Sequence, residues 1–222
     1  MSVGLFDIIG PVMVGPSSSH TAGAVRLGNI ARRIAGEDFK QVDFYLHGSF
    51  AQTYQGHGTD KALLGGVMGM EASDERIKNS LAIAGQAGLK YSFQSADLGN
   101  QHPNTVKIII HNDNNSSCSV VGSSIGGGKV LVTEINGMKV EFTGQYPAII
   151  SQHHDEPGVV ANISFILADA GINIAFLKVF RQVRAGEASM VIETDQRVDR
   201  EIIKKLEDIR GINKIVFVDI DE

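Results

Sequence analysis

The first group of side chains able to do chemistry lies in residues 16–21, which read Pro-Ser-Ser-Ser-His-Thr. The group comprises four hydroxyls and one imidazole, from Ser17, Ser18, Ser19, His20 and Thr21. Hydroxyls directly before a helical pattern are N-cap candidates, and a helix N-terminus favours an anionic group. The run predicts a site for a carboxylate. The alternative is a helix cap beside a solvent-exposed histidine.

A second candidate is the run Gly-His-Gly-Thr-Asp-Lys at residues 56–61. His57 stands between two glycines, which predicts exposed, adaptable backbone at the start of a helix. Histidine is the usual general base near neutral pH. The run predicts a catalytic base, and the alternative is a turn that carries a surface histidine.

Two further histidines are weaker candidates. His102 and Asn104 flank a proline, and this segment is also compatible with a simple strand entry. His47 follows a predicted strand and is equally compatible with a buried, hydrogen-bonded histidine. The glycine run 126–128 is a poor phosphate loop, because it lacks the full P-loop pattern and precedes a strand.

The elements that position these residues follow from hydrophobic spacing. In the first half we expect a helix at 21–35, a strand at 42–46, a glycine-punctuated loop at 48–58, and helices at 60–70 and 74–87. Strand patterns follow at 106–110, 129–135 and 138–142, with a strand-like stretch at 116–122. The dipeptide Asn136-Gly137 predicts a tight hairpin between the last two of the main strands.

A new unit begins near residue 146. We expect a strand at 148–152, a turn at 155–158 and a helix at 159–170 that is ended by a glycine. Strands follow at 174–180 and 188–194. A helix capped by Asp199 then runs to about residue 210, and a last strand covers 212–220. This order, βαββαβ, predicts a ferredoxin-like unit. The fold class is therefore α+β, with a mixed α/β domain at 1–145 and the ferredoxin-like domain at 146–222.

Composition narrows the function classes. The chain has 222 residues, of which 43% are hydrophobic and 20% charged, as in ordinary globular proteins. Its net charge of −5 argues against nucleic acid and anionic membrane as partners. No apolar run approaches the roughly 20 residues that span a bilayer, and Asp7 interrupts the short apolar start, so we expect a cytoplasmic protein.

Cys118 is the single cysteine in the sequence. An intrachain disulfide is therefore excluded, and a cluster held by several thiolates cannot be built from this chain alone. The sequence predicts no metal ligands.

The C-terminal unit resembles an ACT domain, through its element order, the Pro-Gly after its first strand and the run Gly-Ile-Asn-Ile at 171–174. The resemblance implies a small-amino-acid effector such as serine, bound across a dimer interface by His153, Asp155 and Asn173. Asp155 departs from the usual asparagine, and its charge suits the effector's ammonium group or a monovalent cation. The alternative is a dimerisation unit without a ligand.

The whole chain resembles the beta subunit of bacterial iron–sulfur L-serine dehydratases. The resemblance is carried by the runs 15–21, 47–51, 56–62 and 124–128, in the family's order. It implies deamination of L-serine to pyruvate and ammonia, a reaction that feeds gluconeogenesis. It also implies an alpha subunit as partner, whose cysteines hold a 4Fe–4S cluster.

The resemblance also implies roles for the candidate residues. His57 is the expected base, and His20 orients the substrate or transfers a proton. The substrate contacts are expected from Ser17, Ser18, Ser19 and Thr21, with His102 and Asn104 as second-rank contacts.

Two other functions compete with this one. A pyridoxal-phosphate dehydratase needs a Schiff-base lysine that no convincing Ser-x-Lys site supplies here. A non-catalytic serine-sensing regulatory subunit is the stronger alternative. The pair His20 and His57 discriminates against it, because a sensor needs hydrogen bonds but no positioned base.

Overall fold

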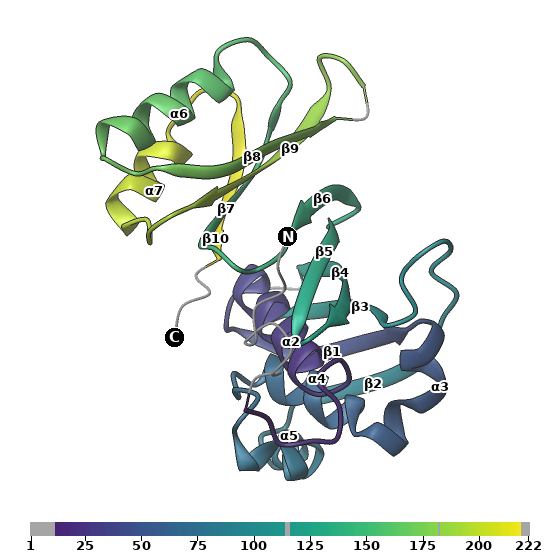
Figure 1. Cartoon of the computed structure of the whole chain (residues 1–222). Helices are drawn as coiled ribbons and strands as arrows, with labels where there is room; N and C mark the ends of the chain where they lie inside the picture. The colour runs from purple at the N-terminus through teal and green to yellow at the C-terminus, as the bar shows by residue number, and fades with distance from the viewer. Residues whose placement is uncertain (1–11, 114–115, 182, 219–222) are drawn as a thin grey trace, which may run out of the picture. The chain divides into compact units, whose positions relative to one another are not determined.

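The computed structural model describes residues 12–113, 116–181 and 183–218 (Figure 1). The chain divides into two compact units, Met1–Asn136 and Gly137–Glu222. The limits predicted for two domains, 1–145 and 146–222, stay a prediction. None of the described helices is long and apolar enough to cross a bilayer.

Residues 22–142 form helices and the strands of one six-stranded sheet, whose last strand lies within the residues of the second unit. The helices are α2 (Ala22–Ala35), α3 (Gly48–His57), α4 (Thr59–Val67), the short 3-10 helix η1 (Glu75–Asn79) and α5 (Ser80–Gln86). The strands are β1 (Phe39–Leu46), β2 (Lys90–Ser95), β3 (Thr105–Asn112), β4 (Ser117–Gly126), β5 (Lys129–Ile135) and β6 (Met138–Phe142). Their order in the sheet is β2-β1-β3-β4-β5-β6, with β1 and β2 parallel. The mixed α/β prediction is confirmed.

Helix α2 lies against the sheet and packs closely on α4. A Cβ placed at Gly66 would lie 2.1 Å from the backbone oxygen of Val25, and one placed at Gly28 would lie 2.4 Å from the oxygen of Leu63. Only glycine allows backbones to approach this closely. These two glycines therefore set the distance between the helices that carry the candidate site.

The prediction of a loop at 48–58 was wrong, because this segment forms helix α3. Its glycines stand at the ends and not in the middle: Gly48 is the first residue, and Gly58 ends the helix in the left-handed conformation with φ 70°. Phe50 is fully buried and anchors the helix to the core. Tertiary burial therefore decides the structure of a segment whose glycine content favours a loop.

The serine hydroxyls predicted as helix caps do not cap α2. Its N-cap is Thr21, without a side-chain hydrogen bond to the helix. Backbone oxygens take this role: Ser17 O accepts from Thr21 N at 2.8 Å, and Ser18 O accepts from Gly23 N at 2.9 Å. Of the serine hydroxyls, Ser17 Oγ accepts from His20 N at 3.4 Å, ahead of the first residue of α2.

Other differences lie at element ends. The helix predicted at 74–87 is divided, because Asp74 caps η1 by accepting from Arg76 N at 2.9 Å and α5 begins only at Ser80. Strand β2 was not predicted. The predicted hairpin is confirmed, since Asn136 and Gly137 both have positive φ, as a type I′ turn requires.

The second unit contains β7 (Ala148–His154), α6 (Val159–Asp169), β8 (Ile174–Arg181), β9 (Glu187–Thr194), α7 (Arg200–Glu207) and β10 (Ile212–Val218). The antiparallel sheet has the order β10-β7-β9-β8, and α6 packs beside α7 (Figure 1). The ferredoxin-like prediction is confirmed, including the left-handed Gly171 after α6. Helix α7 ends three residues early, and the Asp199 side chain makes no capping bond to it. The last two residues of the predicted final strand lie outside the described ones.

Candidate functional site

The predicted motifs of the first unit meet where strands of the sheet begin and end. At the end of β1, His47 N donates to Thr105 O at 3.0 Å, at the start of β3. Pro103 O accepts from Phe50 N in the first turn of α3 at 3.4 Å, and Asn104 O accepts from Ser124 N on β4 at 2.9 Å. Hydrogen bonds thus join the segments around His47, His102–Asn104 and Ser124.

The start of α2 contacts the same region. A Cβ placed at Gly23 would lie 2.0 Å from Ser124 Oγ, so only glycine fits there. The Ser124 hydroxyl is fully buried and has no hydrogen-bond partner among the described residues. Helix α2 is therefore held with its N-terminus against the end of β4.

His20 and His57 are brought into direct contact. Their ring centroids are 4.7 Å apart, with an interplanar angle of 89°. Phe50 packs edge-on against the other side of His20, at 5.3 Å between centroids. His20 is buried, whereas His57 is exposed. One imidazole is thus enclosed by protein and the other faces solvent.

Each of these histidines stands two residues before a helix. His20 precedes α2, which begins at Ala22, and His57 precedes α4, which begins at Thr59. Because the two rings touch, both helix N-termini lie at this site. The positive end of the α2 dipole favours a carboxylate there. At α4 the Lys61 N–H already donates to Asp60 Oδ1 at 2.8 Å, and α3 ends at the same point.

The His20 ring is held at both nitrogens. Thr53 Oγ1 lies 3.1 Å from Nε2, and Ser17 Oγ lies 3.4 Å from Nδ1. Burial, and to a smaller extent the nearby His57, lower the pKa of His20 below its ordinary value of 6.5. His20 is accordingly a neutral imidazole near pH 7, able to accept a proton.

The structure separates the remaining candidates. Ser18 and Ser19 are half-buried beside His20. Thr21 is only 2% exposed, and its side chain packs against Gly15, so it faces the protein interior and not an open site. That Thr21 contacts substrate stays a prediction.

His102 is exposed, and its Nδ1 accepts from Asn104 N at 3.1 Å. In the part of the chain that the structure describes, no hydrogen bond joins His102 or Asn104 to the two paired histidines. The buried Asn104 Oδ1 has no partner among these residues. The segment contributes to the site mainly through its backbone, which holds α3 and β4 together.

Sequence reasoning missed Phe50 and Thr53, which both contact His20. They precede His57 by seven and four residues, the spacing of one helical face. This spacing is visible in the sequence. It was not used, because the segment was predicted to be a loop, and helical spacing has no meaning in a loop. Recognition of α3 as a helix would have revealed both residues.

The predicted effector residues lie in the second unit. His153 is buried, with Nδ1 3.2 Å from Ser151 Oγ, and burial lowers its pKa. Asp155 accepts from Arg181 Nη1 at 2.8 Å and from Ala185 N at 3.1 Å. The Arg181 hydrogen bond lowers the pKa of Asp155.

Asn173 is exposed, and its Nδ2 donates to Asp195 Oδ2 at 2.5 Å. Among the described residues no hydrogen bond links Asn173 to His153 or Asp155. One copy of the chain therefore does not join the three predicted effector contacts into one hydrogen-bonded site.

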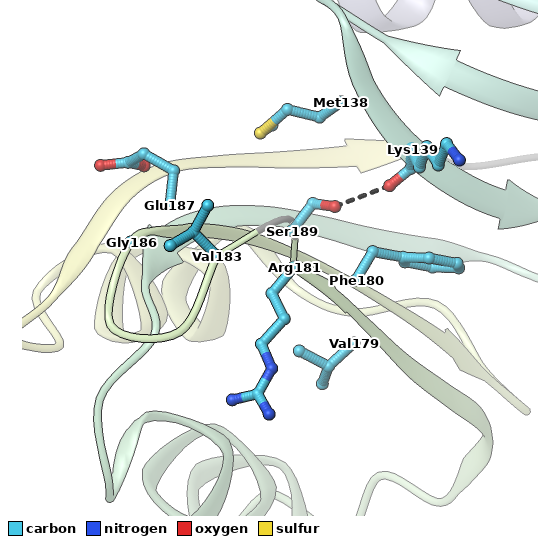
Figure 2. A pocket seen from close by; sticks show the side chains of 9 residues that line it. All are labelled: Met138, Lys139, Val179, Phe180, Arg181, Val183, Gly186, Glu187 and Ser189. Atoms are coloured by element: carbon cyan, nitrogen blue, oxygen red, sulfur yellow. Dashed lines mark hydrogen bonds between the residues drawn. The ribbon is translucent and has the colours of Figure 1, made fainter.

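A cavity of about 640 Å³ opens beside Arg181 (Figure 2). Much of its lining is apolar. It is formed by Met138, Lys139, Val179, Phe180, Arg181, Val183, Gly186, Glu187 and Ser189. Figure 2 shows the Ser189 hydroxyl donating to the Lys139 carbonyl, at 2.8 Å, so this lining hydroxyl is already bonded within the protein.

The residues of this chain do not fit an iron–sulfur cluster. Such a cluster is held by several cysteines, and the sequence has one. Cys118 is buried in β4, and the described residues contain no group of three or more His, Cys, Asp or Glu side chains able to hold a metal ion.

Comparison with known proteins decides the family. The serine dehydratase beta chain profile matches residues 4–87, and the ACT domain profile matches residues 148–211. The L-serine dehydratase beta chain of Peptoniphilus asaccharolyticus is 40% identical, over 97% of this chain and 97% of that protein. This chain belongs to the L-serine dehydratase beta chain family. Another family relative, the probable L-serine dehydratase beta chain of Bacillus subtilis, is 43% identical over 96% of this chain and 97% of that one.

This chain also resembles part of a different protein. D-3-phosphoglycerate dehydrogenase of Methanocaldococcus jannaschii is 27% identical over 89% of this chain, which corresponds to 37% of the dehydrogenase. The similarity to this dehydrogenase therefore extends beyond the ACT domain of this chain.

Proposed function

We propose that this chain is the beta half of a two-chain enzyme that converts L-serine into pyruvate and ammonia. The family supports the reaction, and one observation carries the role of this chain: the contact between His20 and His57 at two helix N-termini. A sensor of serine needs hydrogen bonds to the amino acid. It does not need two imidazoles in contact, of which one is solvent-accessible.

The first task of these residues is to hold the substrate carboxylate. The N-terminus of α2 supplies backbone N–H groups, and Ser18 and Ser19 beside it supply hydroxyls, whereas the Ser17 hydroxyl is directed to His20. An anion bound at this point orients the rest of serine relative to the two histidines.

His57 is the group that takes the α-proton of serine in this proposal. Its ring is exposed at the end of α3, beside the left-handed Gly58, and reaches a substrate without rearrangement of the core. Loss of this proton and of the β-hydroxyl leaves aminoacrylate, which tautomerises and hydrolyses to pyruvate and ammonia. The buried His20 orients the substrate or transfers a proton.

A 4Fe–4S cluster belongs, in this proposal, to a cysteine-bearing alpha chain, because this chain cannot hold one. When bound there, the cluster supplies a Lewis acid for departure of the β-hydroxyl. The pyruvate formed is a precursor for gluconeogenesis.

We further infer that the ACT unit binds serine as effector, through His153, Asp155 and Asn173. The lack of a hydrogen bond between Asn173 and the other two within one chain supports a site shared between two copies. The Arg181 ion pair keeps Asp155 charged, so the ammonium group of an amino acid or a monovalent cation would share this carboxylate with Arg181.

The test is pyruvate formation from L-serine by this chain co-expressed anaerobically with its alpha chain. His57→Asn keeps a polar side chain but cannot act as the base. We expect kcat to fall about 10²- to 10⁴-fold while the visible absorbance of the cluster is retained. His111→Asn, which changes a histidine bound to Asp43 on the sheet, is the matched control and should keep the wild-type rate.

Two results would contradict the proposal. A wild-type pair that assembles with its cluster and makes no pyruvate favours the serine-sensing regulatory subunit. Full activity of His57→Asn would instead show that another group takes the proton.

A further inference from the structure

The Thr53 hydroxyl on α3 stands between a backbone oxygen and the His20 ring. Thr53 Oγ1 donates to Ser49 O at 2.7 Å, one helical turn earlier, and lies 3.1 Å from His20 Nε2. Ser49 O can only accept a hydrogen bond, and a threonine hydroxyl has one proton to give. Thr53 therefore faces His20 with a lone pair, and the proton of the second hydrogen bond must come from Nε2.

The opposite nitrogen of His20 has a different neighbour. Ser17 Oγ lies 3.4 Å from Nδ1 and also 3.4 Å from the His20 backbone N–H. One arrangement satisfies all these contacts in a neutral ring: the Ser17 oxygen accepts from the backbone N–H, and its own proton points at the bare Nδ1.

We propose that Thr53 is a positioning residue that fixes His20 as its Nε2–H tautomer and leaves Nδ1 as the nitrogen that accepts protons. This inference rests on the proposed function, because it assigns the atom of His20 that exchanges protons during the reaction. Thr53 touches neither substrate nor cluster in this account and acts only through His20.

The His20 ring is enclosed by protein, so the groups at its two nitrogens can determine its tautomer. Phe50 and His57 contact the ring from two directions, and the side chain is only 8% exposed. An enclosed ring cannot find water as a substitute partner at Nε2. The tautomer therefore depends on the protein groups at the two nitrogens.

The test uses the full chain labelled with nitrogen-15 in histidine, and the intact two-chain enzyme for kinetics. Thr53→Val keeps the shape of the side chain and removes its oxygen, whereas Thr53→Ser keeps the oxygen. Nitrogen NMR shifts, assigned to His20 by comparison with His20→Asn, report which ring nitrogen carries the proton. Thr133→Val, on β5, is the matched control, because its hydroxyl makes only a 3.5 Å contact with a backbone oxygen.

We expect a protonated Nε2 and a bare Nδ1 in the wild type, in Thr53→Ser and in Thr133→Val. Thr53→Val should show a mixture of the tautomers. It should lower kcat about 10- to 100-fold with KM within about two-fold, whereas Thr53→Ser restores most of the rate.

The inference is overturned if Thr53→Val keeps the wild-type tautomer, or if Thr53→Ser loses as much activity as Thr53→Val. The NMR measurement does not depend on the reaction. A wild-type enzyme without activity therefore contradicts the proposed function, while the tautomer shift in Thr53→Val alone still supports the positioning role.

Discussion

At the scale of single residues, burial opposes a positive charge on His20, and the neighbouring His57 ring, 4.7 Å away between centroids, adds to this effect. The neutral state of His20 is thus a property of its surroundings. The same surroundings make folding sensitive to pH.

The free energy of unfolding should fall in mild acid because of His20. Its pKa in the folded chain lies below the ordinary value of 6.5, so below pH 6.5 the unfolded chain takes up a proton that the folded chain does not. The contribution of His20 to the free energy of unfolding is therefore complete above pH 6.5. It is lost as the pH falls through the folded-state pKa of His20.

Urea unfolding at pH 7.5 and pH 5.5 checks this expectation. The wild type should lose more stability between the two pH values than His20→Asn does, since other groups, among them His153, contribute equally to both proteins. Equal losses in the two proteins would show that the His20 environment does not disfavour its charge.

At the scale of elements, the site depends on how closely α2 and α4 pack. Glycines at the crossing allow backbone to touch backbone, and the two helix N-termini then meet beside the paired histidines. A side chain larger than that of glycine at the crossing would push α2 and α4 apart, and with them His20 and His57.

Gly66→Ala should destabilise the protein by about 3 kcal/mol, because its Cβ would lie 2.1 Å from the backbone oxygen of Val25. Gly85→Ala on α5 is the matched control. No atom lies within 4 Å of a Cβ placed there, so this change should stabilise by roughly 0.5–1 kcal/mol. Chemical denaturation of the two variants measures the difference, and equal stabilities would show that the crossing can open without cost.

At the scale of the whole molecule, the chain combines one unit that bears the paired histidines with another that bears the predicted effector residues. The two groups of residues are associated with separate sheets, of six and of four strands. Binding to the ACT unit can therefore be weakened without a change at His20 or His57.

Asn173→Ala should weaken binding of L-serine to the ACT unit about 10-fold, the effect of one lost hydrogen bond. Calorimetric titration of the full chain without its alpha partner measures this binding. Asn213→Ala is the control, because it is also an exposed asparagine with one side-chain partner, Glu187. Unchanged binding in Asn173→Ala would favour an ACT unit that serves dimerisation alone.

The amino-acid sequence by itself determined the features that depend on local spacing. The βαββαβ order of the second unit, the Asn136-Gly137 hairpin and helix α2 follow from hydrophobic period and turn residues, which act over a few neighbours. His20 and His57 also stood out locally, as imidazoles beside hydroxyls and glycines. The family resemblance added the reaction and the partner chain.

Only the tertiary structure decided how these pieces meet. Segment 48–57 is a helix because Phe50 is buried in the core, a fact that its glycine content conceals. The contact of His20 with His57 and the bond from His20 to Thr53 join residues more than thirty positions apart. Such contacts are determined by how helices and strands pack. The pattern of residues along the chain does not say how far apart two elements lie in the folded protein.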